Sequence, residues 1–376
     1  MSQQINYSER LDRLRADAQR IDAVATVLVP GANMIYFTGL HLHLSERPAL
    51  AFVLTDGGTA FIMPALELSK IDHLPPEMDV RHVFGWEDET GYEVAFAAAN
   101  ETLGLAGKRL GVDDMTMRVF ESLALLEAIP ELQMKPHGQA LLNLRVIKAD
   151  EEIALMREAI ALSEKALLET LRTVRVGMTE REIAGLLAEQ LQAAGSEGNA
   201  FAPLVQIGEK SALPHGFVGD RALAEGDILL LDFGGTCGGY PADITRTYVF
   251  GEPSDEVRAM YQAVYDANIA GRAACAPGVS AVDVDKATRS VIEAAGYGEY
   301  FIHRTGHGLG LEIHELPQIA VGSDDVLQTG MVFTIEPGIY VPGVGGVRIE
   351  DDVVVTADGA ESLTTLERAL TSVPLA

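Results

Sequence analysis

The chain has 376 residues, enough for two or three domains of ordinary size. Hydrophobic residues make up 48% of it and charged residues 22%, so we expect a soluble globular protein and exclude disorder or a disulfide-stapled miniprotein. Acidic residues number 55 against 28 basic ones, a formal net charge of −27. Because nucleic-acid phosphates and anionic membrane surfaces repel such a charge, we expect the protein to bind neither.

The cysteines and the N-terminal residues indicate the cellular compartment in which we expect the protein. Cys237 and Cys275 form no CxxC motif, which argues against a zinc ribbon or a disulfide framework. The first ten residues contain no apolar signal-peptide core, and no stretch reaches about 18 consecutive apolar residues. These features predict a cytoplasmic protein without a transmembrane segment.

The first part of the chain alternates helix and strand patterns. Residues 8–21 have apolar side chains at helical spacing, with Ser8 as a candidate N-cap. Asp56-Gly57-Gly58 has the composition of a hairpin turn. The other predicted elements are strands over 25–30, 33–40, 50–64 (on both sides of this turn) and 108–114, and a helix over 90–104. We therefore predict an α/β domain over residues 1–144.

The pattern changes near Arg145, where a second domain, residues 145–376, is predicted to begin. Asp150 is a candidate cap for a helix that runs to about Val174, and Thr179 with Glu182 predicts a capping box for the next helix. Further helices are predicted over 254–275 and 280–295, and strands over 228–235, 240–250, 331–341 and 347–356. Helices combined with an antiparallel sheet give the whole chain the fold class α/β (α+β).

Two aspartates flank a predicted hairpin in this domain. Asp232 follows four apolar residues, and Asp243 begins the returning strand. If Cys237-Gly238 is a two-residue turn, the two aspartates lie directly opposite each other, with Cβ atoms about 5 Å apart. Like charges at such positions destabilise a sheet unless a cation lies between them. Either aspartate taken alone is equally well explained as a turn residue or a paired surface group.

A second predicted hairpin repeats the arrangement with Glu336 and Glu350, which a loop centred on Gly343 would place opposite each other. The repetition favours a shared divalent cation or a pair of cations about 3.5–4 Å apart that activate a water molecule. Residues 303–314 add three histidines among glycines, which we expect to let the backbone approach an ion. Oxygen ligands with one imidazole suit Mn, Co or Zn.

These residues resemble a known family, the metallopeptidases of the pita-bread fold, which includes methionyl aminopeptidase, aminopeptidase P and prolidase. The resemblance covers residues 145–376 and rests on Asp232 and Asp243 eleven positions apart, His307 in HRTGHGLGLEIHELP, Glu336 in TIEPGIY and Glu350 in GVRIEDD. The segment MIYFTGL…SERPALAFVL also resembles the N-terminal domain of the proline-specific members. The implied architecture is a creatinase/prolidase-like α/β domain followed by a pita-bread catalytic domain.

The resemblance implies two divalent metal ions per subunit, with manganese expected first and cobalt or zinc as alternatives. By this resemblance Asp232 binds one ion, and Asp243 and Glu350 bridge both. His307 and Glu336 complete the second ion's ligands, and Glu336 is also the general base.

The resemblance also implies roles for residues that do not bind metal. The catalytic histidines would be His215, His303 and His314. The substrate-binding residues would be His215, Tyr240, His314 and Arg348.

The implied reaction is hydrolysis of Xaa-Pro bonds by metal-activated hydroxide, and the first expectation is an Xaa-Pro dipeptidase (prolidase) that is a homodimer. Aminopeptidase P, acting on longer peptides, is the alternative, because Gln318 stands where many prolidases carry an arginine that could hold the dipeptide carboxylate. A metal-free pita-bread binding protein is a third, weaker hypothesis. Arg47, in a predicted loop that would close the site from a second subunit, is the residue we expect to grip the carboxylate instead.

Overall fold

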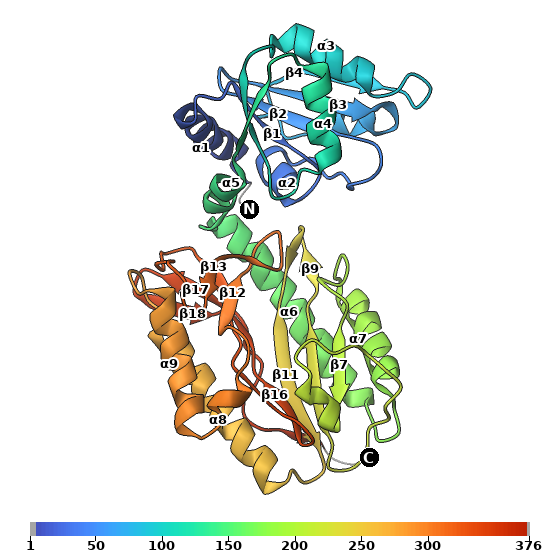
Figure 1. Ribbon diagram of the computed structural model, residues 1–376. Helices are drawn as coiled ribbons and strands as arrows, with labels where there is room; N and C mark the ends of the chain where they lie inside the picture. Colours follow the sequence, from blue (N-terminus) through green and yellow to red (C-terminus); the bar gives the residue numbers. More distant parts are fainter. Residues whose placement is uncertain (1–4, 374–376) are drawn as a thin grey trace. The chain divides into compact units, whose positions relative to one another are not determined.

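The computed structural model describes residues 5–373, which form two compact units (Figure 1). The N-terminal unit comprises residues 5–145 and the C-terminal unit residues 146–373. Each has hydrophobic clusters of its own. Within the described residues, no helix is both long enough and apolar enough to cross a membrane.

A six-stranded sheet in the order β4-β3-β2-β1-β5-β6 forms the centre of the N-terminal unit. Its strands are β1 (Ala25–Leu28), β2 (Leu50–Leu54), β3 (Thr59–Pro64), β4 (Val80–Trp86), β5 (Arg109–Val112) and β6 (Gln133–Pro136). The α-helices of the unit are α1 (Tyr7–Arg20), α2 (Ala32–Thr38), α3 (Glu93–Leu103), α4 (Val119–Ala128) and α5 (Gly138–Arg145). Helix α1 packs on β1 and β2, and α3 packs on β3 and β4, so apolar side chains on both helices cover the sheet.

One predicted strand of this unit is wrong. Residues 33–40 mostly form α2, which ends at Gly39 in the left-handed conformation (φ 72°), whose backbone N–H donates to the Ile35 carbonyl. Its apolar residues suit a strand and a helix equally well. The helix buries Asn33 and Phe37, which lie one turn apart and therefore share a face.

Two local expectations for this unit had different outcomes. The turn Asp56-Gly57-Gly58 joins β2 to β3 as predicted, with positive φ at both glycines. Ser8 is not the N-cap of α1. The side chain of Asn6 accepts the hydrogen bond from the backbone of Glu9 instead, so the helix begins earlier than predicted.

The C-terminal unit contains two main sheets, in the orders β19-β11-β8-β7 and β13-β12-β14-β17-β18, and two short hairpins, β9-β10 and β15-β16. The strands of the first sheet and hairpin are β7 (Leu204–Ile207), β8 (Ile228–Phe233), β9 (Thr236–Cys237), β10 (Tyr240–Pro241), β11 (Ile244–Phe250) and β19 (Ser372–Val373). Those of the second sheet and hairpin are β12 (Gly306–Gly308), β13 (Glu315–Ile319), β14 (Val332–Ile335), β15 (Gly338–Val341), β16 (Gly345–Arg348), β17 (Asp351–Thr356) and β18 (Gly359–Ser362).

Two helix pairs cover these sheets, as Figure 1 shows. They are α6 (Asp150–Thr173) with α7 (Glu180–Ala194), and α8 (Asp255–Ala274) with α9 (Ala281–Ala294). The predicted capping box of α7 is present, since Thr179 and Glu182 each accept a hydrogen bond from the other's backbone. Asp150 does not cap α6: it is the first helical residue, and Glu152 accepts from the backbone of Ala149.

The predicted register of the aspartate hairpin is wrong by two residues. The turn is Gly238-Gly239, with φ of 56° and 79°, and Cys237 pairs with Tyr240. These positive φ values belong to the tight turn that matches strand twist, and glycine adopts them without strain. Asp232 therefore lies opposite Thr245 instead of Asp243. Side chains repeat every two residues along a strand, so both aspartates still face the same side.

The register of the glutamate hairpin is the predicted one. Gly338 pairs with Arg348 in β15-β16, and Ile335 pairs with Asp351 in β14-β17. Glu336 and Glu350 lie between these two ladders, at positions that continue the same register. The two glutamates therefore face each other where one sheet ends and the short hairpin begins.

Candidate active site and metal centre

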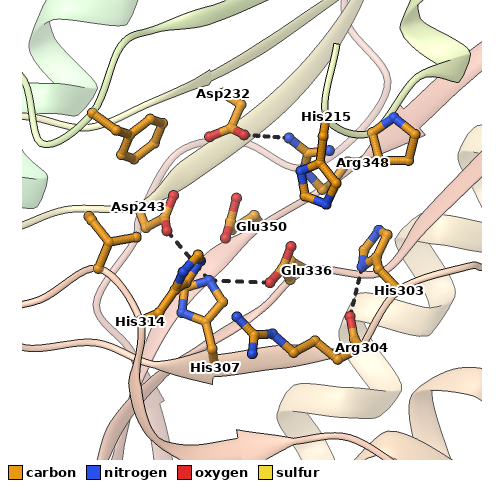
Figure 2. Close-up of a pocket in the computed structure, with 13 residues that line it drawn as sticks. His215, Asp232, Asp243, His303, Arg304, His307, His314, Glu336, Arg348 and Glu350 are labelled. Atoms are coloured by element: carbon orange, nitrogen blue, oxygen red, sulfur yellow. Dashed lines mark hydrogen bonds and ion pairs between the residues drawn. The ribbon is translucent and has the colours of Figure 1, made fainter. Parts of the chain in front are cut away.

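A cleft of about 610 Å³ in the C-terminal unit is lined by charged and imidazole side chains (Figure 2). Its carboxylates are Asp232, Asp243, Glu336 and Glu350, and its imidazoles are His215, His303, His307 and His314. The rest of its lining is Phe201, Pro214, Arg304, Ile313 and Arg348. The five residues expected to bind metal therefore lie in one cleft.

The imidazole of His307 points at the carboxylates. Its Nε2 lies 3.4 Å from Glu336 Oε1 and 3.6 Å from Asp243 Oδ2. Its Nδ1 lies 3.1 Å from the Gly308 carbonyl, to which it can only donate, so Nε2 carries the lone pair that a metal needs. Asp243, His307 and Glu350 each offer a ligand atom, and these atoms lie within 4.8 Å of one another.

Burial raises the pKa of all four carboxyl groups. For Asp243 and Glu350, burial and then repulsion from neighbouring carboxylates raise the pKa well above its usual range. Burial raises the pKa of Glu336 to about 7, and that of Asp232 rises although Arg348 opposes the change. Arg348 pairs with Asp232, but the other three carboxyls form no ion pair with a described arginine or lysine, and a divalent cation would supply the positive charge. The donor set therefore fits a metal site.

Two known protein families match the sequence of this chain, and one of them covers the segment that contains the cleft residues. Residues 154–357 match metallopeptidase family M24, and residues 10–147 match the Creatinase/Prolidase N-terminal domain. The chain belongs to metallopeptidase family M24. Its two-domain fold, a creatinase/prolidase-like domain followed by a pita-bread domain, is the one that the sequence resemblance implied.

Similar proteins cover almost the whole chain. The Xaa-Pro dipeptidase of Pyrococcus furiosus is 35% identical over 367 residues, which is 96% of this chain and 99% of that protein. The solved prolidase from Thermococcus sibiricus is 33% identical with a TM-score of 0.92, covering 98% of this chain and 100% of that one. The X-Pro aminopeptidase from Thermotoga maritima is 32% identical with a TM-score of 0.84, covering 95% and 100%.

Arg348 lines this M24 cleft, but protein groups already occupy its guanidinium. Nη2 donates to Asp232 Oδ2 at 2.5 Å, Nη1 donates to the Tyr340 hydroxyl at 2.9 Å, and Nε donates to Thr245 Oγ1 at 2.9 Å. Arg348 therefore positions one expected metal ligand, and its donors are not directed at a substrate.

The three histidines expected to act in catalysis differ in their contacts. His303 is held on both sides, with Nδ1 2.7 Å from the Arg304 carbonyl and Nε2 2.9 Å from the Tyr340 hydroxyl. His215 and His314 make no hydrogen bond to any described residue, although the His314 ring packs edge-on against His307 with centroids 4.3 Å apart. Their ring nitrogens are the imidazole groups available to a substrate.

The glycines around His307 lie close to the backbone of the adjacent strands. A Cβ on Gly306 would lie 1.8 Å from the Thr334 carbonyl oxygen, and one on Gly308 would lie 2.0 Å from that of Leu316. These glycines let β12 fit between its neighbouring strands. That they also let the backbone approach an ion stays a prediction.

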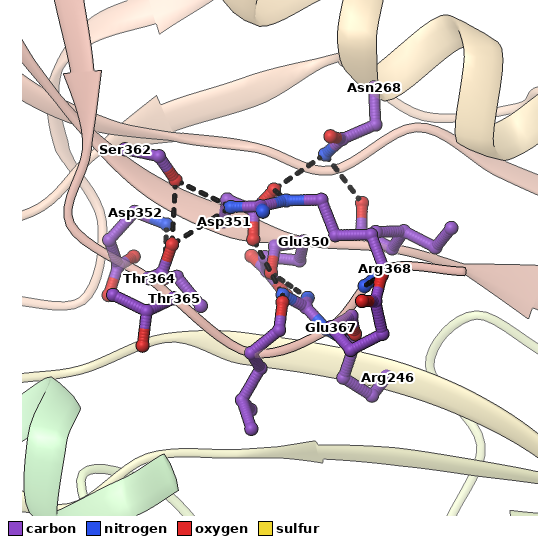
Figure 3. Close-up of polar contacts among 12 residues, drawn as sticks. Arg246, Asn268, Glu350, Asp351, Asp352, Ser362, Thr364, Thr365, Glu367 and Arg368 are labelled. Atoms are coloured by element: carbon purple, nitrogen blue, oxygen red, sulfur yellow. Dashed lines mark hydrogen bonds and ion pairs between the residues drawn. The ribbon is translucent and has the colours of Figure 1, made fainter. Parts of the chain in front are cut away.

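A buried polar network supports the glutamate hairpin from behind (Figure 3). Arg246 donates to the Glu350 carbonyl at 2.7 Å and to Asp351 Oδ1 at 2.7 Å, and Arg368 and Asn268 donate to the other oxygen of Asp351. In addition, Thr245 Oγ1 donates to Glu350 Oε2 at 2.6 Å. The role of these supporting residues depends on contacts between distant strands, so no sequence motif indicates it.

Tyr240, expected to bind substrate, does not reach the cleft. Its side chain is only 2% exposed and packs in the hydrophobic core, and its hydroxyl donates to Glu152 Oε1 at 2.7 Å. Tyr240 pairs with Cys237 in the β9-β10 hairpin and its side chain faces α6, a position that the family resemblance alone did not reveal.

Arg47, the other expected substrate-binding residue, belongs to the N-terminal unit. Its Nε and Nη2 donate to the two oxygens of Asp88 at 2.9 and 2.8 Å, and Nη1 pairs with Glu46. The guanidinium thus already grips a carboxylate of its own unit. Its action on a second subunit stays a prediction.

Arg304 is the charged cleft residue that the sequence analysis missed. It stands between His303 and Thr305 inside the very motif used for the family resemblance, so its position was a usable signal. Arg304 Nη1 donates a hydrogen bond to the side-chain oxygen of Gln318, the residue that stands where many prolidases carry an arginine.

Proposed function

We propose that this chain is an Xaa-Pro dipeptidase that works with two divalent metal ions, manganese first and cobalt or zinc as alternatives. The observation that carries the proposal is the convergence of four buried carboxyls and the His307 imidazole in one cleft. Asp232 would hold one ion, Asp243 and Glu350 would bridge the pair, and His307 with Glu336 would complete the second ion's ligands.

Bound ions would polarise the scissile carbonyl and activate the attacking water. Glu336 would hold the proton that this water loses, at a carboxylate oxygen whose buried setting suits proton transfer near neutral pH. His215 and His314, whose nitrogens face no protein partner among the described residues, would donate to the oxygen on which charge develops. His303 would act indirectly, by fixing Tyr340 beside Arg348.

Two observations and one property of the Xaa-Pro bond support proline specificity. The relatives include proteins named Xaa-Pro dipeptidase and prolidase. The apolar part of the cleft lining, Phe201, Pro214 and Ile313, offers surface for a pyrrolidine ring. The Xaa-Pro nitrogen carries no N–H, so an enzyme for this bond requires no acceptor for one.

The test is turnover of an Xaa-Pro dipeptide by purified protein, stripped of metal and then reloaded with Mn, Co or Zn. We expect no activity without metal and activity after reloading, with about two ions per chain by elemental analysis. An Xaa-Ala dipeptide is the control. Equal turnover of both dipeptides would contradict proline specificity, and full activity without metal would contradict the metal mechanism.

Aminopeptidase P is the alternative, supported by the similarity to the Thermotoga maritima enzyme and by the glutamine at position 318. Preferential cleavage of an Xaa-Pro-Yaa tripeptide over the dipeptide would favour it. We also propose a cytoplasmic homodimer, which cell fractionation and light scattering would test.

A further inference from the structure

We propose that Arg304 binds the free carboxylate at the C-terminus of the peptide, and that Gln318 positions it. The inference rests on the proposed dipeptidase function and names the residue that would make the cleft selective for a free C-terminus. A substrate carboxylate that leaves water for this cleft needs a cation beside it, because the proposed metal ions would already be bound by the four carboxyls that line the cleft.

Arg304 is the cleft cation that remains available. Arg348 is occupied by Asp232, Tyr340 and Thr245. Among the arginines described in the C-terminal unit, Arg304 and the surface residue Arg175 have no carboxylate within 4.0 Å, whereas the others each form an ion pair. The one hydrogen-bonding partner of the Arg304 side chain within the described chain is the neutral amide of Gln318.

Gln318 is held in place through both its side chain and its backbone. Its Nε2 donates to the Glu315 carbonyl at 2.9 Å, which turns the amide oxygen toward Arg304. Its backbone N–H donates to Asp325 Oδ2 at 2.7 Å, and it lies directly opposite His307 across the β12-β13 ladder. Gln318 therefore fixes one guanidinium nitrogen without neutralising the charge, and leaves the other donors for a ligand.

Arg304 lies two residues before β12, the strand that carries His307, and Figure 2 shows its guanidinium on the His307 and Glu336 side of the cleft. A planar guanidinium can grip a carboxylate through two parallel hydrogen bonds, which fixes the distance between the substrate's C-terminus and the metal ligands. Only a peptide with one residue after the cleaved bond would bring its carboxylate to this point.

The decisive experiment compares an Xaa-Pro dipeptide with the same dipeptide carrying a C-terminal amide. We expect Arg304→Met to lower kcat/KM for the dipeptide on the order of 100-fold, mainly through KM, and to change amide hydrolysis far less. Arg304→Lys should recover part of the dipeptide activity, because it restores charge without the two-pronged geometry. Gln318→Met should raise KM for the dipeptide by roughly tenfold with kcat unchanged.

Arg175→Met is the matched control, since it removes the other unpaired arginine of the unit, and Arg47→Ala tests the competing candidate. Thermal melting and metal content show whether each variant is folded and loaded. Equal losses on dipeptide and amide, or no loss in Arg304→Met, would overturn the inference while leaving the proposed function intact. Loss of dipeptide preference in Arg47→Ala alone would also overturn it. A folded, metal-loaded wild type that cleaves no Xaa-Pro peptide would overturn the proposed function, and this inference with it.

Discussion

The two carboxylate hairpins of the pita-bread domain each place two carboxylates on the same side of a sheet, but with different strand registers. In the aspartate hairpin, Asp232 and Asp243 are two residues out of register, because the Gly238-Gly239 turn places Thr245 opposite Asp232. In the glutamate hairpin, Glu336 and Glu350 continue one register through two successive ladders. The comparison teaches that a shared face, and not direct opposition, brings carboxylates together, because a shift of two residues preserves the face and a shift of one reverses it.

The largest effect should follow from removing one of the two carboxylates that we propose to bridge the metal ions, one from each hairpin. We expect Asp243→Asn and Glu350→Gln each to lower kcat/KM for an Xaa-Pro dipeptide by roughly 10³-fold or more, since each change would weaken the binding of both metal ions. Elemental analysis should show reduced metal content in both. Glu361→Gln, which removes an exposed carboxylate paired with Arg157, is the control and should behave as wild type. A variant that retains metal and activity would show that its hairpin does not form the bridge.

A smaller effect should separate the two turns. One glycine inserted between Gly238 and Gly239 forces a one-residue shift or a bulge beside Asp243, so we expect metal affinity to fall on the order of 10- to 100-fold. The same insertion between Gly343 and Val344 lengthens a loop at the far end of β15-β16, and should change affinity little. Metal titrations of both variants measure the difference. Equal tolerance in both places would refute the claim that strand face decides the site.

The smallest effect concerns the metal-free protein. Folding raises the pKa of the cleft carboxyls above their values in the unfolded chain, for Glu336 from 4.5 to about 7. The folded state therefore binds protons more tightly than the unfolded chain. The contribution of these carboxyls to the free energy of unfolding should be complete below about pH 4.5 and decrease as the pH rises toward 7. Bound metal should reverse this trend, because it favours the charged carboxylates. Melting temperatures with and without metal test it, and a metal-free protein that gains stability over this range would contradict it.

The sequence predicted the chemistry of the site better than its geometry. The five expected ligands share one cleft, because alternation along strands and the motif around His307 are local properties that a sequence displays. The tight turn, the helix at Ala32–Thr38 and the core position of Tyr240 depend on backbone conformation and packing between distant segments. Arg304 stands inside the histidine motif, so its place near the site could have been predicted, but its lack of a carboxylate partner is known only from the structure.

The pairing of Arg304 with Gln318 has a consequence at the level of the gene. A single base change converts a glutamine codon into an arginine codon or the reverse. Two such changes, Gln318→Arg and then Arg304→Gln, would therefore move the arginine from the segment before β12 to strand β13. The intermediate would carry arginine at both positions, one just before β12 and one on β13, close to four carboxyls that tolerate extra positive charge. During evolution, the arginine that binds the peptide's free C-terminus can therefore move from one position to the other. Every intermediate along this route keeps an arginine for that carboxylate.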